Sequence, residues 1–337
     1  MKQLVSILIP AFNSEKWISD CIESALAQTW RWKEIIVVDD GSTDSTLKIA
    51  SSYASPDVQV TTQNNCGASA ARNRALSLAQ GDYIQWLDAD DLLAPDKVAR
   101  QLEGAEPGQS SLILISGAWG KFYCRPERAR FEPNSLWEDL DPLEWLYRKI
   151  NENLWMAIES WIVSRRLTET AGPWNESLSL DDDGEYFCRI LSCSCGTRFI
   201  SEARCFCRRA NFGISHGLTL NNRKLDSLLI SLLSYIQRLK SMEDSPRTRN
   251  ACLKFLERWA IYFYPERPDL FQKMQLMAID LGGQLYPPKL RAKYRWLQAL
   301  FGWRIAKKTQ ATLPTLRSLA HKWLERFYDS DPPKNGA

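Results

Sequence analysis

The sequence has no apolar run that reaches the roughly 18 residues needed to span a bilayer. Its first residues, MKQLVSILIPAFN, lack the long apolar core of a secretory signal peptide. We therefore expect a cytoplasmic protein. Neither sign of charge predominates, because the chain has 43 Lys and Arg and 40 Asp and Glu, which gives a formal net charge of +3. That balance gives no reason to expect nucleic acid as a partner.

Nine cysteines are present, an odd number, and four of them form two C-x-C pairs, Cys193 with Cys195 and Cys205 with Cys207. Zinc sites favour C-x2-C or wider spacing, so we expect free thiols in a reducing compartment. The 14 Trp and 11 Tyr fit a core, a sugar-stacking surface or a membrane interface equally well.

Apolar, strand-like runs alternate with segments of helical spacing through the first third of the chain. The expected strands are 4–10, 34–38, 58–63, 83–87 and 111–117, and the expected helices are 13–28, 67–80 and 95–104. This alternation predicts an α/β fold, a mostly parallel central sheet flanked by helices and joined by right-handed crossovers. In such sheets ligands bind beyond the carboxyl ends of the strands.

Four strand ends carry polar residues toward that edge. They are Pro10 to Asn13, Asp39 with Asp40, Gln63 to Gly67, and Asp88 to Asp91. The D-x-D of Asp88 and Asp90 offers the oxygen ligands that Mg2+ or Mn2+ share with a bound diphosphate. A solvated turn in which Asp90 or Asp91 caps the next helix is the alternative.

The other strand ends suggest a nucleotide. A carboxylate at Asp39 or Asp40 can accept a hydrogen bond from a nucleobase, although turn and capping chemistry is the alternative for this acidic stretch. The helix that opens at Gly67 favours an anion at its N-terminus. Arg72, further along that helix, can reach a phosphate or form a salt bridge to a surface acid.

Four motifs in order carry a resemblance to a known family: VSILIPAFNSEKWISDCIESALAQTW, EIIVVDDGSTDST, NCGASAARNRAL and GDYIQWLDADD. They resemble the family 2 glycosyltransferases of the GT-A fold, strongly over residues 4–100 and more weakly to about 215. The resemblance implies transfer of a sugar from a nucleotide-diphosphate donor with inversion, and a need for Mg2+ or Mn2+. It also implies that Asp88 and Asp90 bind the metal and that Asp39 and Asp40 serve base and ribose.

The remaining donor-site predictions follow the same motifs. The nucleotide-sugar site is predicted to include Pro10, Ala11, Asn13, Glu15, Asn65, Gly67, Arg72, Asp88 and Ala89.

A later acidic stretch, LDDDGEYFCRIL, resembles the family segment that carries the general base six residues before an Arg. Asp183 and Arg189 have that spacing, so Asp183 is the predicted base and Asp182 the alternative. Mutual repulsion within the triplet would raise one pKa toward neutrality, which suits a base. Acids that cap the N-terminus of a helix are the other interpretation.

Residues outside these motifs give further predictions. Arg208, Arg209, Ser215 and His216 could close over a diphosphate. Trp161 could stack on an acceptor sugar or lie in the core. We expect a GT-A domain over 1–220 and a helical region over 221–337. Within it, residues 286–308 are basic and aromatic, and could lie on a membrane surface or pack on the domain.

The predicted function is that of a metal-dependent inverting glycosyltransferase. It would move a sugar from a UDP-, GDP- or dTDP-linked donor to a hydroxyl of a glycan or lipid-linked acceptor, in the cytoplasm or peripherally at the inner face of the membrane. A nucleotidyltransferase of similar architecture and a non-catalytic nucleotide-sugar-binding homologue are the alternatives.

Overall fold

The computed structural model describes residues 3–104, 112–209, 221–290 and 292–310. Its first sheet has the strand order β3-β2-β1-β4-β8. The strands are β1 (Val5–Ala11), β2 (Lys33–Asp39), β3 (Val58–Thr62), β4 (Tyr83–Trp86) and β8 (Val163–Ser164). The first four are parallel, and β8 runs antiparallel to β4. The predicted α/β fold with a mostly parallel sheet is confirmed.

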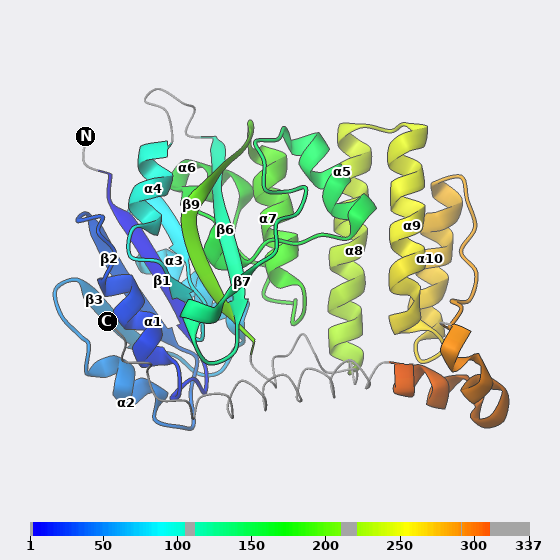
Figure 1. Ribbon diagram of the computed structural model, residues 1–337, viewed down its shortest axis with the longest axis horizontal. Coiled ribbons are helices and arrows are strands. Elements are labelled where there is room, and N and C mark those ends of the chain that lie inside the picture. Colours follow the sequence, from blue (N-terminus) through cyan, green and yellow to red (C-terminus); the bar gives the residue numbers. More distant parts are fainter. Residues whose placement is uncertain (1–2, 105–111, 210–220, 291, 311–337) are drawn as a thin grey trace, which may run out of the picture.

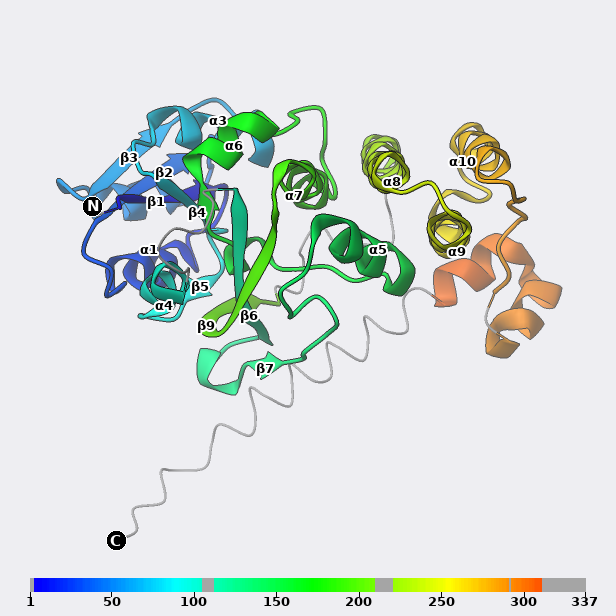
Figure 2. The same cartoon turned by 90° about the horizontal axis from the view of Figure 1, so that it is seen from above.

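Helices cover both faces of this sheet. They are α1 (Ile18–Leu26), α2 (Thr46–Ser51), α3 (Ala68–Leu78), α4 (Lys97–Gly104) and α6 (Arg165–Ala171). In Figure 2, α3 and α6 lie on one side of the strands and α1 and α4 on the other. Because both faces are covered, β1 and β2 are buried over most of their length, which explains their continuous apolar runs.

A second sheet has the order β5-β9-β6-β7. Its strands are β5 (Leu92–Leu93), β6 (Ile113–Phe122), β7 (Arg130–Phe131) and β9 (Gly196–Arg208). β6 and β9 run parallel, with a register shift after Gly117. A Cβ at Gly117 would lie 2.1 Å from the carbonyl oxygen of Ala203, so only glycine fits there. A bridge from Ile115 to Ile162 joins the two sheets.

The remaining helices build a second core. They are α5 (Pro142–Glu152), α7 (Asp182–Cys193), α8 (Asn222–Met242), α9 (Pro246–Phe263) and α10 (Pro268–Asp280), with short 3-10 turns η1 (Pro126–Arg128), η2 (Ile158–Ser160) and η4 (Ala292–Tyr294). α8 and α9 lie in the region predicted to be helical and stand beside α10 at one end of the molecule (Figure 1).

This second core includes residues from before position 220. Leu146 and Ile150 of α5 and Cys188 of α7 pack against apolar residues of α8 and α9. The division at residue 220 therefore stays a prediction. Residues 295–310 are helical, with a break at Gly302, whose φ is 79°. In the part of the chain that the structure describes, no helix has the length and apolar character to cross a membrane.

Candidate active site

The loops that follow β1 and β2 are tied together at the carboxyl edge of the sheet. Asn13 adopts a left-handed conformation, with φ 48°, and its Oδ1 accepts from the backbone N–H of Thr43 at 2.9 Å. Glu15 Oε2 accepts from the N–H of Ser45 at 3.0 Å. Pro10 and Ala11 lie in β1 beside Val38 and Asp39 of β2. The predicted pocket-lining residues therefore fix the shape of this edge.

Asp39, at the end of β2, has one free carboxylate oxygen. Its Oδ2 accepts from Thr62 Oγ1 at 2.9 Å and from the N–H of Ser42 at 3.3 Å. Its Oδ1 is buried and has no hydrogen-bond partner among the described residues. A buried acceptor without a donor is costly, so this oxygen suits an N–H or O–H group supplied by a ligand.

The neighbouring Asp40 is occupied by the protein itself. Its carboxylate accepts from Gln63 Nε2 at 2.7 Å and from the N–H groups of Cys66 and Gly67 at 3.0 and 2.8 Å. Asn65 Nδ2 donates to the Asp40 carbonyl at 3.0 Å. Gly67 has φ 96° and stands directly before α3. Asp40 thus holds the start of α3, and its contact with base or ribose stays a prediction.

Arg72 of α3 joins two acidic segments that lie far apart in the sequence. It is buried, and its guanidinium bonds Asp88 Oδ1 and Asp182 Oδ2, each at 2.8 Å. The ring of Trp174 lies under it, 4.5 Å from the guanidinium carbon. Burial disfavours the charge of Arg72, but Asp88 and Asp182 raise its pKa above the ordinary value. Its salt bridges are to the predicted metal and base segments, not to a surface acid.

The loop after β4 carries the D-x-D pair. Asp88 is bonded by Arg72 and partly exposed, Ala89 is buried, and the Asp90 carboxylate has no side-chain partner among the described residues. Burial, followed by the charge of Asp88, raises the pKa of Asp90 to about 6. Oxygen donors in this pattern suit a hard divalent cation, which would lower that pKa. The donor set therefore fits Mg2+ or Mn2+.

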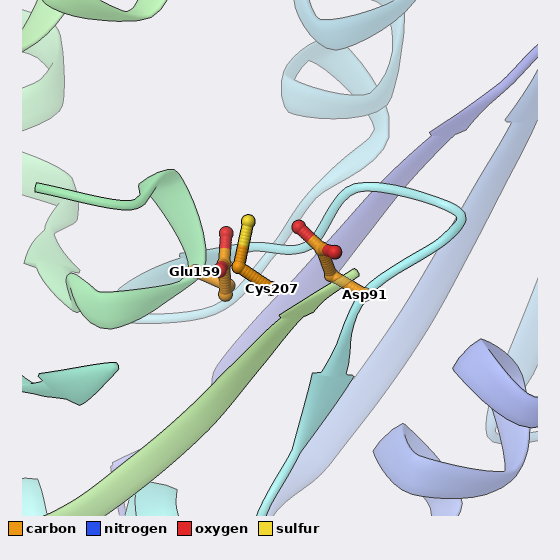
Figure 3. Close-up of side chains that lie close together, drawn as sticks. All are labelled: Asp91, Glu159 and Cys207. Carbon is orange, nitrogen blue, oxygen red and sulfur yellow. The ribbon is translucent and has the colours of Figure 1, made fainter. Parts of the chain in front are cut away.

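The third acid of this loop, Asp91, turns inward rather than capping the next helix. Its Oδ1 accepts from the N–H of Arg208 at 2.5 Å. Figure 3 shows its carboxylate facing Glu159 of η2 and Cys207 of β9, and the ligand atoms of the three lie within 4.8 Å of one another. Burial raises the pKa of both carboxyl groups well above their ordinary values. The three ligand atoms are close enough to one another to hold a metal ion.

Arg208 fixes the same loop from β9. Its Nε donates to the carbonyl of Asp90 at 2.8 Å, and its guanidinium carbon lies 4.3 Å from the ring of Trp17. Glu159 and the loop-fixing role of Arg208 were not predicted, since they depend on pairings between distant segments. The predicted Ser215 and His216 lie outside the described residues.

Each acid of the triplet at the start of α7 has a different environment. Asp181 has φ 57° and accepts from the Tyr235 hydroxyl at 2.5 Å. Asp182 is bonded by Arg72 and by Ser69 Oγ at 3.1 Å. Asp183 receives no hydrogen bond or ion pair from any described side chain, and burial, then Asp182 and Asp181, raise its pKa to about 7. Among the three, only Asp183 combines a free carboxylate with a pKa near neutrality.

Trp161 and Trp174 pack against α7, and Arg189 lies in this helix. Trp161 is buried and stacks on Phe187 at 5.3 Å, so it belongs to the core. Arg189, six residues after Asp183, bonds Glu185 at 2.8 Å instead of a site group. Trp174 stacks on Tyr186 at 4.0 Å beneath Arg72, a platform that the sequence did not reveal. None of the nine cysteines forms a disulfide.

Part of the chain matches a known family. Residues 6–156 match the model of glycosyl transferase family 2. An uncharacterized glycosyltransferase of Haemophilus influenzae is 43% identical over 117 residues, which are 34% of this chain and 46% of the relative. The chain therefore spans less than half the length of that relative.

Solved structures share the fold. TarS of S. aureus in complex with UDP aligns with a TM-score of 0.59 and 19% identity, covering 88% of this chain and 79% of the other. The mannosyltransferase PcManGT of Pyrobaculum calidifontis, in complex with GDP-Man and Mn2+, aligns with a TM-score of 0.52 and 18% identity over 93% and 88%. The fold is thus of the GT-A type. The match to glycosyl transferase family 2 covers residues 6–156, less than half of the chain.

Proposed function

We propose that the protein transfers a sugar, with inversion, from a nucleotide-diphosphate donor to a hydroxyl group of a glycan or lipid-linked acceptor. The observation that carries this proposal is the chain of contacts Asp182–Arg72–Asp88. It links the D-x-D loop to the segment of Asp183, so that a free carboxylate stands near the groups suited to a metal and a diphosphate.

The donor would lie along the carboxyl edge of the sheet. The free Oδ1 of Asp39 suits an N–H of the base or an O–H of the ribose. TarS has been solved with UDP-GlcNAc and PcManGT with GDP-Man. Because these donors carry different bases, UDP-, GDP- and dTDP-sugars are all candidates. A thermal-shift screen of the three with Mn2+ identifies the donor, since a ligand at about 100 times its Kd adds roughly 2.7 kcal/mol to stability.

The reaction needs one base and one stabilised leaving group. Asp183 accepts the proton of the acceptor hydroxyl while the hydroxyl oxygen bonds to the anomeric carbon. The bond from that carbon to the diphosphate oxygen breaks on the opposite face, so the configuration inverts. Asp88 and Asp90 would hold Mg2+ or Mn2+, which when bound neutralises the charge that develops on the diphosphate.

Replacing Asp90 with Asn tests the metal role, with Asp96→Asn as the matched control. Asp96 follows on the same segment but only forms an exposed ion pair with Arg100. We expect the Asp90 variant to lose Mn2+-dependent donor binding in calorimetry and turnover, while the control keeps both. Undiminished turnover without divalent cation would contradict the metal role.

Product analysis separates the alternatives. A glycosyltransferase releases nucleoside diphosphate, whereas a nucleotidyltransferase releases pyrophosphate. Donor binding with no release of either product would favour the non-catalytic homologue.

We also propose that residues 286–308 bring the protein to the inner face of the membrane, where a lipid-linked acceptor would be found. The acid-free stretch from Leu281 to Leu324 supports this contact, because basic segments with aromatic residues favour anionic membrane surfaces.

A further inference from the structure

The segment after α10 has one face packed on the protein and another left exposed. Leu290, Tyr294 and Ala306 are buried. Trp303 meets the ring of Tyr264 at 5.2 Å, and Lys307 Nζ donates to the Tyr264 carbonyl at 2.9 Å. These contacts attach the segment to the end of α9, so its outer face is held in place.

The exposed side of the segment is apolar to an unusual degree. Its large apolar residues are 52–69% exposed: Trp296, Leu300, Phe301 and Ile305. We call these four residues the outer apolar face. Four large exposed apolar side chains within residues 296–305 are more than the single ones that are ordinary on a surface, and they suit an interaction surface.

A basic pocket adjoins these residues in the chain. It has a volume of about 390 Å3 and is lined by Pro288, Lys289, Leu290, Arg295, Gln298 and Trp303. Neither Lys289 nor Arg295 forms an ion pair with any residue of the described structure, and the pocket lining contains no acid. Two cations beside amide and indole N–H groups form a donor set suited to a phosphate.

We propose that the basic pocket binds the phosphate of an anionic phospholipid while the outer apolar face enters the membrane interface. This inference rests on the proposed membrane contact of residues 286–308, and names its site and lipid chemistry. Charge favours a lipid over a second copy of the chain, because a two-fold contact through this surface would set like charges against each other. The apolar residues beside the pocket favour a lipid over free phosphate.

Co-sedimentation with vesicles tests the proposal on the full chain. The protein should sediment with phosphatidylcholine vesicles that contain phosphatidylglycerol and not with phosphatidylcholine alone. Replacing Lys289 and Arg295 together by Gln should weaken this binding about 25-fold, since each basic residue near an anionic surface is worth about fivefold. Lys289→Arg should retain it. The control double variant, Lys48→Gln with Arg74→Gln, removes the same charge from an exposed region elsewhere and should bind like the wild type.

The outer apolar face is tested separately. Trp296→Ser with Phe301→Ser should lower vesicle binding without changing the affinity for the soluble donor. Equal binding to both kinds of vesicle, or full binding by the Gln double variant, would overturn the proposal. So would a concentration-dependent dimer, measured by sedimentation, that the Ser variant abolishes. Donor hydrolysis in solution is measured in parallel, so that a failure here is distinguished from a failure of the proposed function.

Discussion

Replacement of Asp183 by Asn is expected to lower turnover strongly and at the same time to stabilise the fold at alkaline pH. The Asn side chain has the same shape but cannot accept a proton from the acceptor. A positioned base contributes typically 10²–10⁴-fold to the rate, so turnover should fall by about that factor. Most substitutions at partly buried sites destabilise a protein, and a gain of stability therefore marks a residue kept for function.

The magnitude follows from the raised pKa. Burial and the neighbouring acids move the pKa of Asp183 from 3.8 to about 7, and each unit is worth about 1.36 kcal/mol. Since the folded state binds this proton more tightly, the wild type loses stability as pH rises from 3.8 to about 7, by at most about 4 kcal/mol. The Asn variant does not titrate there, so its advantage is largest above pH 7 and vanishes below about pH 4.

Urea unfolding near pH 5 and near pH 8 measures this difference. The paired control is Asp182→Asn, which removes an ion pair of Arg72 and should destabilise the protein. In the wild type, kcat/KM should rise with pH through about 7, because the base must be ionised. An Asp183→Asn variant that still turns over, or a wild-type profile with no acid limb in this range, would show that another group is the base.

Two further substitutions test the supporting contacts. Arg72→Met leaves Asp88 and Asp182 without their shared partner. Breaking a buried ion pair costs about 3–5 kcal/mol of unfolding free energy. The exposed Arg74→Met is the control, and equal stability of the two variants would refute the bridging role of Arg72. Tyr235→Phe removes the hydroxyl that donates to Asp181, which should lower the free energy of unfolding by about 1–3 kcal/mol. The control is the exposed Tyr262→Phe, whose melting temperature should not change. An unchanged melting temperature for Tyr235→Phe would contradict a stabilising role of this hydrogen bond.

The sequence predicted the first sheet well because its strands are buried on both faces. Continuous apolar runs that end in acids or turn residues mark β1, β2 and β4 without reference to the rest of the chain. The strands after residue 120 have no such signal. β8 has two residues, and β9 alternates irregularly between buried and exposed positions because it bends across a register shift.

The candidate site was predictable where the residues are local to strand ends and not where they depend on distant pairings. Asp88 and Asp90 follow β4, and their position could be read from the chain. By contrast, Arg72 meets Asp182 only because α3 and the start of α7 converge, and Asp91 meets Glu159 only where η2 approaches β9. Such contacts cannot be inferred from the type and position of one residue. For the same reason, the role of Asp40 was predicted without its hydrogen bonds to the loop before α3.

The two ion pairs of Arg72 limit its use in neutralising a bound diphosphate. Its guanidinium already bonds an acid on each side, so a phosphate could use it only by displacing Asp88 or Asp182. Arg208, the other buried guanidinium of this edge, donates to the Asp90 carbonyl and lies against Trp17. Burial, followed by the charge of Asp88, raises the pKa of Asp90 to about 6, so a negative charge on Asp90 is unfavourable in this loop without a further cation. A bound diphosphate would add negative charge, which is the physical reason for proposing that Asp88 and Asp90 hold a divalent cation.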